Sequence, residues 1–429
     1  MEPKNFLFIS LDALIGDIAW QIVKEGHNVK YYIKNPEEKE VADGFVPKVD
    51  NWENEVDWAD VIIFDDVLGQ GTIAKKLRDQ GKFVIGGTPY TDKLEDERAF
   101  GQEELKNFGV SIIPYKDFTS FDDAINFVRD NPGKYVIKPS GQAQNIKGLL
   151  FIGEEDDGKD LIQVLGDYKK AWSKKITSFQ LQKRIIGVEI AVGAFFNGKN
   201  FIYPINVNFE HKKLFPGNLG PSTGEMGTSM FWSGPNKIFN QTLKKFEPKL
   251  AEEGYVGYID LNCIVNNYGI YPLEWTARFG YPTISIQQEG MITPIGEFLY
   301  DLARGNTPKL KVRSGFQIGV RIVVPPFPFT DKETFEVKSK DSIVYFKKPT
   351  NGFHIEDVKL VNDELVVTGT AGVVLIVCGM GQTMRLAQNQ VYNRIKNITI
   401  PHMYYRKDIG DRWYEDSDKL HSWGYLREL

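Results

Sequence analysis

The stretch that decides how this chain is interpreted runs Glu210-His-Lys-Lys-Leu-Phe-Pro-Gly-Asn-Leu-Gly-Pro-Ser-Thr-Gly-Glu-Met-Gly227. It holds four glycines and two prolines between two segments that have the composition of strands. Glycine lets the backbone approach a ligand closely and adopt positive φ, whereas proline fixes the shape of a loop. Composition alone leaves two interpretations open: a surface turn, or a rigid loop that holds a ligand.

The segments before this loop alternate between strand and helix patterns. We expect helices over residues 16–24 and 72–80, and strands at Phe6–Ile9, Asn28–Ile33, Val61–Phe64 and Phe83–Gly86. This order predicts an open α/β unit of Rossmann-like type. Ligands on such sheets bind beyond the carboxyl ends of the strands, so the loops 10–17 and 65–71 are candidate site segments.

The rest of the chain continues as α/β and then changes character. Further strands are expected at Tyr135–Lys138, Phe179–Gln182, Val188–Phe196, Tyr258–Val265 and Tyr271–Trp275. From about residue 313 to 405 short β-like runs dominate, followed by a helix at about 382–396. We expect the polar tail after Asp408 to be loosely attached.

Composition excludes several classes of protein. The 429 residues are 42% hydrophobic and 25% charged, with a formal net charge of −5. These values predict a cytoplasmic enzyme with no nucleic-acid or membrane partner, because a basic surface and an apolar run of about 20 residues are both missing from the sequence. Cys263 and Cys378 lie in apolar runs, and we interpret both as reduced core residues.

A second informative segment spans Asp260 to Gly280. It has the pattern of a hairpin that turns at residues 266–269. On paired strands, Asp260 and Asn262 should share one face and Glu274 and Thr276 another, so that four oxygen ligands converge. Such hard oxygen ligands suit Mg²⁺. Polar residues on solvated strand faces are the alternative.

Lys138 ends an apolar strand and precedes a loop that contains glycine. A lysine at this point can hold phosphate together with backbone N–H groups. The alternative is a strand-end lysine that reaches into water.

The run Gly220–Gly227, which follows a Glu-His-Lys-Lys, resembles the substrate loop of the glycinamide ribonucleotide synthetases (phosphoribosylamine–glycine ligases) of the ATP-grasp superfamily. Gly352-Phe-His354, Gly369-Thr-Ala-Gly-Val and Tyr405-Arg-Lys-Asp-Ile-Gly410 resemble the last domain of that family. The resemblance implies an α/β fold with three parts. These are a Rossmann-like pre-ATP-grasp unit (1–92), a two-lobe ATP-grasp domain (93–312, with about 115–190 covering ATP) and a small β-rich C-terminal domain with its tail (313–429).

The resemblance also implies an ATP site. Arg98 would meet the α-phosphate, Lys138 would hold the phosphates, and the stretch from Pro139 to Lys147 and Gly148 would form a lid, with fewer glycines than the family usually has. The segment from Gln182 to Glu189 would be the hinge that carries adenine. Backbone groups of Lys183 to Ile185 would contact the adenine edge, and the Glu189 carboxylate would accept hydrogen bonds from the ribose.

The family pattern Glu-x-Asn-x-Arg corresponds here to Glu274, Thr276 and Arg278. Glu274 is therefore the principal expected ligand of Mg²⁺ (or Mn²⁺), with Asn262 at the position of a second ligand. Thr276 keeps an oxygen but lacks the amide. Arg278 would stabilise the charge on the transferring phosphoryl group.

Substrate contacts are implied in two places. The first is the diagnostic loop, at His211, Lys212, Pro221, Ser222, Thr223 and Gly224; for His211 a hydrogen-bonded structural histidine is the alternative. The second is the N-terminal unit, at Asp12 and Gly69. There the family has a Gly-Gly-Arg-Glu-His run that holds a phosphate, whereas this chain has Ser10 to Asp17 with two acids and no cation. Two acids would repel a phosphate dianion.

The implied function is an ATP-dependent carboxylate–amine ligase that forms an amide through an acyl phosphate. The nearest named reaction joins phosphoribosylamine to glycine, giving glycinamide ribonucleotide, ADP and phosphate in purine biosynthesis. Two alternatives remain: the same chemistry on another amine or acid, or a non-catalytic nucleotide-binding relative. The expected partners are small molecules only, an amine and a carboxylate such as glycine, and the expected state is a monomer or homodimer.

Overall fold

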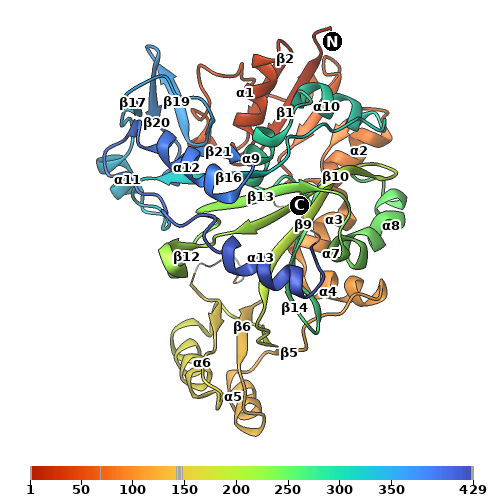
Figure 1. Ribbon diagram of the computed structural model, residues 1–429, viewed down its shortest axis with the longest axis vertical. Helices are drawn as coiled ribbons and strands as arrows, with labels where there is room; N and C mark the ends of the chain where they lie inside the picture. Colours follow the sequence, from red (N-terminus) through yellow and green to blue (C-terminus); the bar gives the residue numbers. More distant parts are fainter. Residues whose placement is uncertain (1, 68, 142, 144–145, 147, 427–429) are drawn as a thin grey trace.

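The computed structural model describes residues 2–67, 69–141, 143, 146 and 148–426. An N-terminal α/β unit lies at the top of Figure 1, a large sheet crosses the middle, and a small lobe hangs below it. The predicted mixed α/β class is confirmed.

The N-terminal unit is a parallel sheet in the order β2-β1-β3-β4. Its strands are β1 (Asn5–Ser10), β2 (Asn28–Ile33), β3 (Val61–Phe64) and β4 (Val84–Ile85). The apolar run Phe6–Ile9 is buried because helices α1 (Gly16–Lys24) and α2 (Gly71–Asp79) connect the parallel strands and pack on the sheet. The strands lie at or within one residue of the predicted ranges. Their carboxyl ends lead into the loops 10–17 and 65–71.

The small lobe is an antiparallel sheet in the order β5-β8-β6-β7 with its own hydrophobic core. It consists of β5 (Tyr115–Phe118), β6 (Tyr135–Pro139), β7 (Phe151–Ile152), β8 (Phe179–Lys183) and helices α5 (Phe121–Asp130) and α6 (Lys159–Trp172). This core lies apart from the main one, so the lobe is joined to the large sheet mainly at its edge (Figure 1). Lys138 stands at the end of β6 that faces the large sheet.

The large sheet has eight antiparallel strands in the order β15-β14-β9-β10-β13-β16-β21-β18. The strands are β9 (Val188–Asn197), β10 (Phe201–Glu210), β13 (Gly227–Ser233), β14 (Val256–Asn266), β15 (Gly269–Thr276), β16 (Phe316–Val323), β18 (Phe353–Ile355) and β21 (Val373–Gly381). Strands on both sides of residue 312 thus belong to one sheet. The helix expected at 382–396 is α12 (Met384–Ile395).

The tail after Asp408 is packed against the sheet, contrary to the sequence prediction. Helix α13 (Trp413–Ser422) crosses the strands in Figure 1. The Trp413 ring lies 4.9 Å from that of Phe316, and Arg412 donates hydrogen bonds to the carbonyls of Glu189 and Glu210. A few apolar residues in a polar segment are enough to anchor it.

The two cysteines, Cys263 and Cys378, are buried free thiols, as predicted. Within the described part of the chain, no helix has the length and apolar character needed to cross a membrane.

Candidate active site

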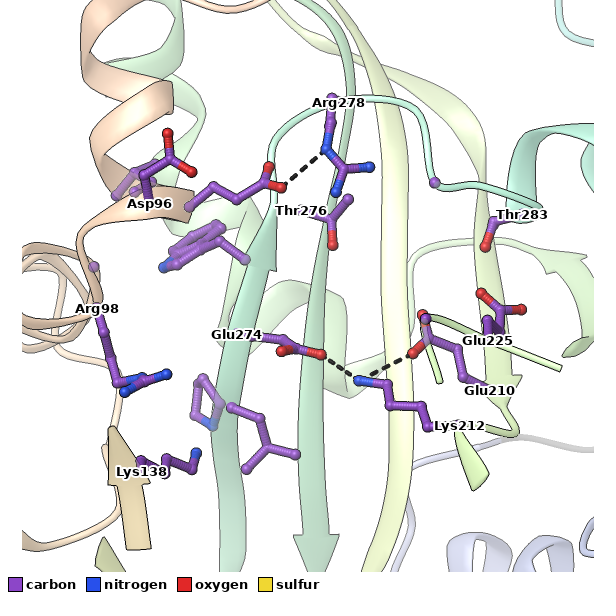
Figure 2. Close-up of a pocket in the computed structure, with 18 of the residues that line it drawn as sticks. Asp96, Arg98, Lys138, Glu210, Lys212, Glu225, Glu274, Thr276, Arg278 and Thr283 are labelled. Carbon is purple, nitrogen blue, oxygen red and sulfur yellow. Dashed lines mark hydrogen bonds and ion pairs between the residues drawn. The ribbon is translucent and has the colours of Figure 1, made fainter. Parts of the chain in front are cut away.

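A cavity of about 420 Å³ lies where the small lobe, the β14–β15 hairpin and the loop after β10 meet. Nine charged side chains from these segments and from the helices at residues 89–107 line it: Glu95, Asp96, Arg98, Lys138, Glu210, Lys212, Glu225, Glu274 and Arg278. Figure 2 shows that most of them point into the same space.

The β14–β15 hairpin supplies one wall of this cavity. The chain turns between Asn266 and Gly269, as predicted, and the register pairs Asp260 with Thr276 and Asn262 with Glu274. Residues directly opposite in an antiparallel pair project from the same face. The four polar side chains therefore share one face of the hairpin. From the sequence we expected Asp260 and Asn262 on one face and Glu274 and Thr276 on another, and this expectation was wrong.

Lys212 is at the centre of the acidic groups. Its ammonium contacts Glu274 directly and lies 3.2 Å from Glu210 and 3.7 Å from Glu189. Burial alone would lower the pKa of Lys212, but these carboxylates hold it well above its ordinary value. In turn Lys212 lowers the pKa of Glu274 to about 2, so Glu274 is ionised at any working pH. Figure 2 shows the lysine between Glu274 and Glu210.

Arg98 and Lys138 approach Glu274 from the other side (Figure 2). Arg98 opens helix α4 (Arg98–Asn107) and donates a hydrogen bond of 2.8 Å to the carbonyl of Pro139, which joins this helix to the end of β6. Lys138 is buried, and burial together with the charge of Arg98 lowers its pKa to about 8. Two cations held close together in a cavity favour a ligand with several negative charges.

Arg278 lies at the opposite end of the cavity. Its Nε is 2.9 Å from a carboxylate oxygen of Glu95, and its guanidinium lies over the ring of Tyr281. Helix α3 (Pro89–Asp96) carries Glu95 and Asp96 into this end. The ion pair fixes the direction of the guanidinium while leaving part of it facing the cavity, as Figure 2 shows.

The diagnostic loop contributes fewer side chains than the sequence suggested. Gly224 lines the cavity, and Thr223 donates two hydrogen bonds, of 2.7 and 2.8 Å, to the carbonyl of Lys212. Pro221 and Ser222 are half-buried on β12 (Leu219–Ser222), outside the cavity lining.

His211 lies behind the loop rather than in the cavity. Its Nε2 accepts a hydrogen bond from the Gly410 backbone, and burial lowers its pKa to about 3. It is therefore a neutral, buried histidine in this structure. Glu210 and Glu225, which we did not single out from the sequence, do line the cavity. Glu210 lies two residues before Lys212, and Glu225 lies two residues after Thr223. In an extended chain such pairs project to the same side, and this spacing was the available signal in the sequence.

The expected adenine hinge is partly engaged in sheet contacts. The N–H of Lys183 donates to the carbonyl of Pro114, and the N–H of Arg184 donates to that of Lys134. Gln182 is buried in the small lobe, and Ile185 is half-buried in the connection to β9. The carboxylate of Glu189 accepts a hydrogen bond of 2.8 Å from the Asn262 side chain. Lys147 lies outside the described residues.

The N-terminal loop differs from expectation. Asp12 accepts a hydrogen bond from Asn35 and does not line the cavity, whereas Gly69 lines a smaller recess beside it. Asp17 is buried and lies 2.7 Å from His354 Nδ1. Asp17 therefore cannot act as the expected repulsive charge on a phosphate, because its partner neutralises it.

The residues proposed for metal binding have donor groups suited to Mg²⁺. Glu274 is an ionised carboxylate, and the Oδ1 atom of buried Asn262 lacks a hydrogen-bond partner in the described structure. Thr276 brings a hydroxyl oxygen to the cavity. Within the described residues no three acidic, histidine or cysteine side chains form a metal site by themselves. Mg²⁺ commonly completes its shell with waters and substrate phosphates, so this smaller donor set fits.

Comparisons with known proteins agree on one family. The family descriptions "Phosphoribosylglycinamide synthetase, ATP-grasp (A) domain" and "Phosphoribosylglycinamide synthetase, C domain" match residues 96–284 and 318–412. The phosphoribosylamine–glycine ligase of Lactococcus lactis is 26% identical over 340 residues, which cover 77% of this chain and 78% of the relative. That of Thermotoga maritima is 23% identical over 410 residues, covering 91% and 95%.

Solved structures give the same fold. The crystal structure of the Thermotoga maritima phosphoribosylamine–glycine ligase superimposes with a TM-score of 0.71 at 20% identity, covering 94% of this chain and 100% of the other. The Campylobacter jejuni biotin carboxylase–β-γ-ATP complex superimposes with a TM-score of 0.61 at 14% identity, covering 98% and 97%.

Proposed function

Because the chain is a phosphoribosylglycinamide synthetase-like ATP-grasp protein, we propose that it is an ATP-dependent ligase that joins a carboxylate to an amine. The reference reaction is the one named for its relatives, the ligation of phosphoribosylamine to glycine, which would place the chain in purine biosynthesis. The observation that carries the proposal is the convergence of Arg98, Lys138 and Glu274 on one cavity from three separate segments.

The reaction has two steps. The γ-phosphoryl group of ATP passes to a carboxylate oxygen of the acid, which yields an acyl phosphate and ADP. The nitrogen lone pair of the amine then attacks the acyl carbon, the bond from that carbon to the phosphate oxygen breaks, and the amide forms as phosphate leaves and the nitrogen loses a proton. No residue of the protein needs to form a covalent bond, so the protein acts by positioning, charge stabilisation and exclusion of water.

Each end of the cavity would have its own task. Arg98 and Lys138 would bind the phosphate chain, because paired cations with fixed geometry recognise phosphate oxygens. Arg278 would stabilise charge on the transferring phosphoryl group and on the tetrahedral intermediate. Glu274, with Asn262 and Thr276, would hold Mg²⁺, which when bound would neutralise part of the phosphate charge. MgADP is present in the related biotin carboxylase domain from Hydrogenobacter thermophilus.

Lys212 would respond to ligand binding. Its ammonium now contacts three carboxylates, those of Glu274, Glu210 and Glu189. A cation bound to Glu274 would compete with the lysine, which would free its ammonium for the carboxylate of the acid substrate. Lys212 is thus proposed as a substrate-binding residue.

The test is ADP and phosphate release with MgATP, glycine and freshly prepared phosphoribosylamine, together with mass detection of the amide. We expect ADP release to require both the acid and the amine. ADP formation only with another pair would keep the ligase function and change its substrates. ATP binding without turnover for any pair tried would contradict the function and favour a non-catalytic nucleotide-binding protein.

A further inference from the structure

A second, smaller recess adjoins the Arg278 end of the main cavity. It is lined by Asp66, Gly69, Thr91, Asp92, Glu95, Asp96 and Ala277, and it shares Glu95 and Asp96 with the main cavity. Its volume of about 10 Å³ leaves room for a single group of the size of a water or an ammonium. The charged side chains among its described lining residues are all acidic.

Asp66 is the principal feature of this recess. Its side chain is buried, with a relative exposure of 8%, and its Oδ1 atom has no hydrogen-bond partner in the described structure. Its φ of +55° lies in the left-handed region, which is uncommon for a residue other than glycine and is seen most often with Asn and Asp. A buried carboxylate oxygen without a partner is costly, and a bound water, ion or polar ligand would remove this cost.

Asp92 crowds the same small space. A Cβ atom at Gly87 would lie 2.1 Å from Asp66 Oδ2 and 2.9 Å from Asp92 Oδ1, so only glycine fits between these two carboxylates and the chain. Asp92 also accepts one hydrogen bond of 3.0 Å from the N–H of Gly71. The two carboxylates therefore approach each other without a basic side chain between them in the described lining.

Two arginines lie near the recess, and the hydrogen bonds of Arg78 go to the backbone and not to the recess carboxylates. Arg278 pairs with Glu95 at 2.9 Å, and Arg78 donates hydrogen bonds to the backbone carbonyls of Gly86 and Gly87. Burial and the neighbouring acids raise the pKa of Asp66 well above its ordinary value, and burial raises that of Asp92 to about 6, although the charge of Arg78 opposes both shifts. The ionised forms of Asp66 and Asp92 are therefore incompletely compensated by the protein, and a bound cation would stabilise them.

The chemistry of a fitting ligand follows from this charge. A phosphate would meet four acidic side chains and no cationic one among the described lining residues, so its negative charge would find no partner there. A neutral hydroxyl could donate a hydrogen bond but would leave the charge in place. A metal ion is disfavoured, since the described residues contain no group of three acidic, histidine or cysteine ligands arranged to hold one. An ammonium group has the size, the charge and the three donors that the recess can accept.

We propose that this acidic recess binds a positively charged group of the amine substrate, so that the amine this chain uses best carries a second ammonium rather than a phosphate. The proposal rests on the ligase function proposed above. It assigns the recess to a small diamine or similar cation whose other nitrogen reaches past Arg278 toward the acyl phosphate.

The test is calorimetric titration of the full chain, with MgADP present, using 1,3-diaminopropane and 3-aminopropan-1-ol. The two probes have the same length and differ in the charge of one end. We expect the diamine to bind at least tenfold more tightly, and Asp66→Asn to remove this preference. The matched control is Glu97→Gln, an exposed acid on the link between α3 and α4 that lines neither cavity, and it should keep the preference.

A thermal melt, the affinities of both probes for the variant and a turnover assay complete the experiment. Asparagine tolerates positive φ, so Asp66→Asn should fold, which a thermal melt checks; if it does not fold, Asp92→Asn takes its place. Equal affinities for the two probes, or diamine binding unchanged in the variant, would overturn the proposal. ADP release with glycine and each amine is measured separately. Diamine binding that depends on Asp66 without turnover would refute the ligase function alone.

Discussion

The two ends of the cavity differ in charge and in how far they follow the family. One end gathers Arg98, Lys138 and Lys212 around the ionised carboxylate of Glu274. The other end places Arg278 against Glu95 and opens into the recess around Asp66. The first suits a polyphosphate, and the second suits a cation.

The difference coincides with the family comparison. The matched ranges begin at residue 96, so they include the residues of the basic end but neither Asp66 nor Asp92. In the proposed function, nucleotide chemistry and substrate choice would therefore be carried by different parts of the chain, and the second could change while the first is kept. Each of the following predictions separates the two ends by experiment.

The largest expected effect is at the basic end. Glu274→Ala should lower turnover on the order of 10³-fold, because it removes the ionised oxygen ligand and leaves three cations facing one another. ADP release under saturating MgATP measures it. The Glu274 side chain is more than half exposed to the cavity, so the melting temperature should change little.

The control for this variant is Glu252→Ala, at an exposed position of helix α8 (Glu247–Glu252), which should keep full activity. Turnover of Glu274→Ala within tenfold of the parent would show that the basic end does not organise the reaction. The two ends of the cavity would then not differ in their contribution to catalysis.

The next effect concerns a buried ion pair that belongs to neither end. Asp17 is paired with His354, and Glu289 lies 3.3 Å from the second ring nitrogen of that histidine. Although burial opposes it, Asp17 holds the pKa of His354 well above its usual range, so the pair is ionic at neutral pH. His354→Ala leaves Asp17 buried without its charged partner and should cost about 3–5 kcal/mol of unfolding free energy.

Urea denaturation at pH 7 measures this cost. His402→Asn, at an exposed position with positive φ, is the control and should be nearly neutral. Because the pKa of His354 is raised in the folded state, the contribution of the pair is complete below about pH 6.5 and is lost as pH rises through the folded value. Loss of diamine binding in correctly folded His354→Ala would contradict the separation of Asp17 from the recess.

The basic end could largely be predicted from the sequence because its residues stand in short local patterns. Glu274 and Thr276 alternate along one strand, and Lys138 ends an apolar run. The predicted strands also lie close to the observed ones, since burial on both faces leaves continuous apolar runs. The eight-stranded order was not predictable in this way, because strand pairing is set by contacts far apart in the chain.

The acidic end could not be predicted for the same physical reason. Asp66 and Asp92 are 26 residues apart, one after β3 and the other within α3, so each alone has the pattern of a solvated charge. Asp17 was misassigned because its partner His354 is 337 residues away. Helix α13 was missed because Trp413 and Leu420, which anchor it, are isolated within a polar segment.

A smaller effect distinguishes the basic end by its pH dependence. Burial and Arg98 lower the pKa of Lys138 to about 8, so the positive charge that holds phosphate is lost as pH rises through this value. We expect kcat/KM for ATP to fall about fivefold between pH 8 and pH 9, as the protonated fraction of a group with this pKa does. Lys138→Arg should keep its charge and remove this fall. The same fall in both enzymes would assign it to another group.

The smallest effect tests whether the recess really lacks positive charge. Burial, followed by the neighbouring Asp96 and Glu95, raises the pKa of Asp92 from 3.8 to about 6. The folded carboxyl therefore binds a proton more tightly than the unfolded one, and its contribution to stability is lost as pH rises from about 4 to about 6.

Asp92→Asn should remove this loss, so its melting temperature relative to the parent should be higher at pH 7 than at pH 4.5, by about 1–2 °C. Differential scanning fluorimetry at both pH values measures it, and 1,3-diaminopropane should reduce the difference by neutralising Asp92 in the parent. If the melting temperatures of the variant and the parent differ by the same amount at both pH values, Asp92 already has a counter-charge in the protein. The acidic end would then have no need of a cationic ligand, and the contrast in charge between the two ends of the cavity would not hold.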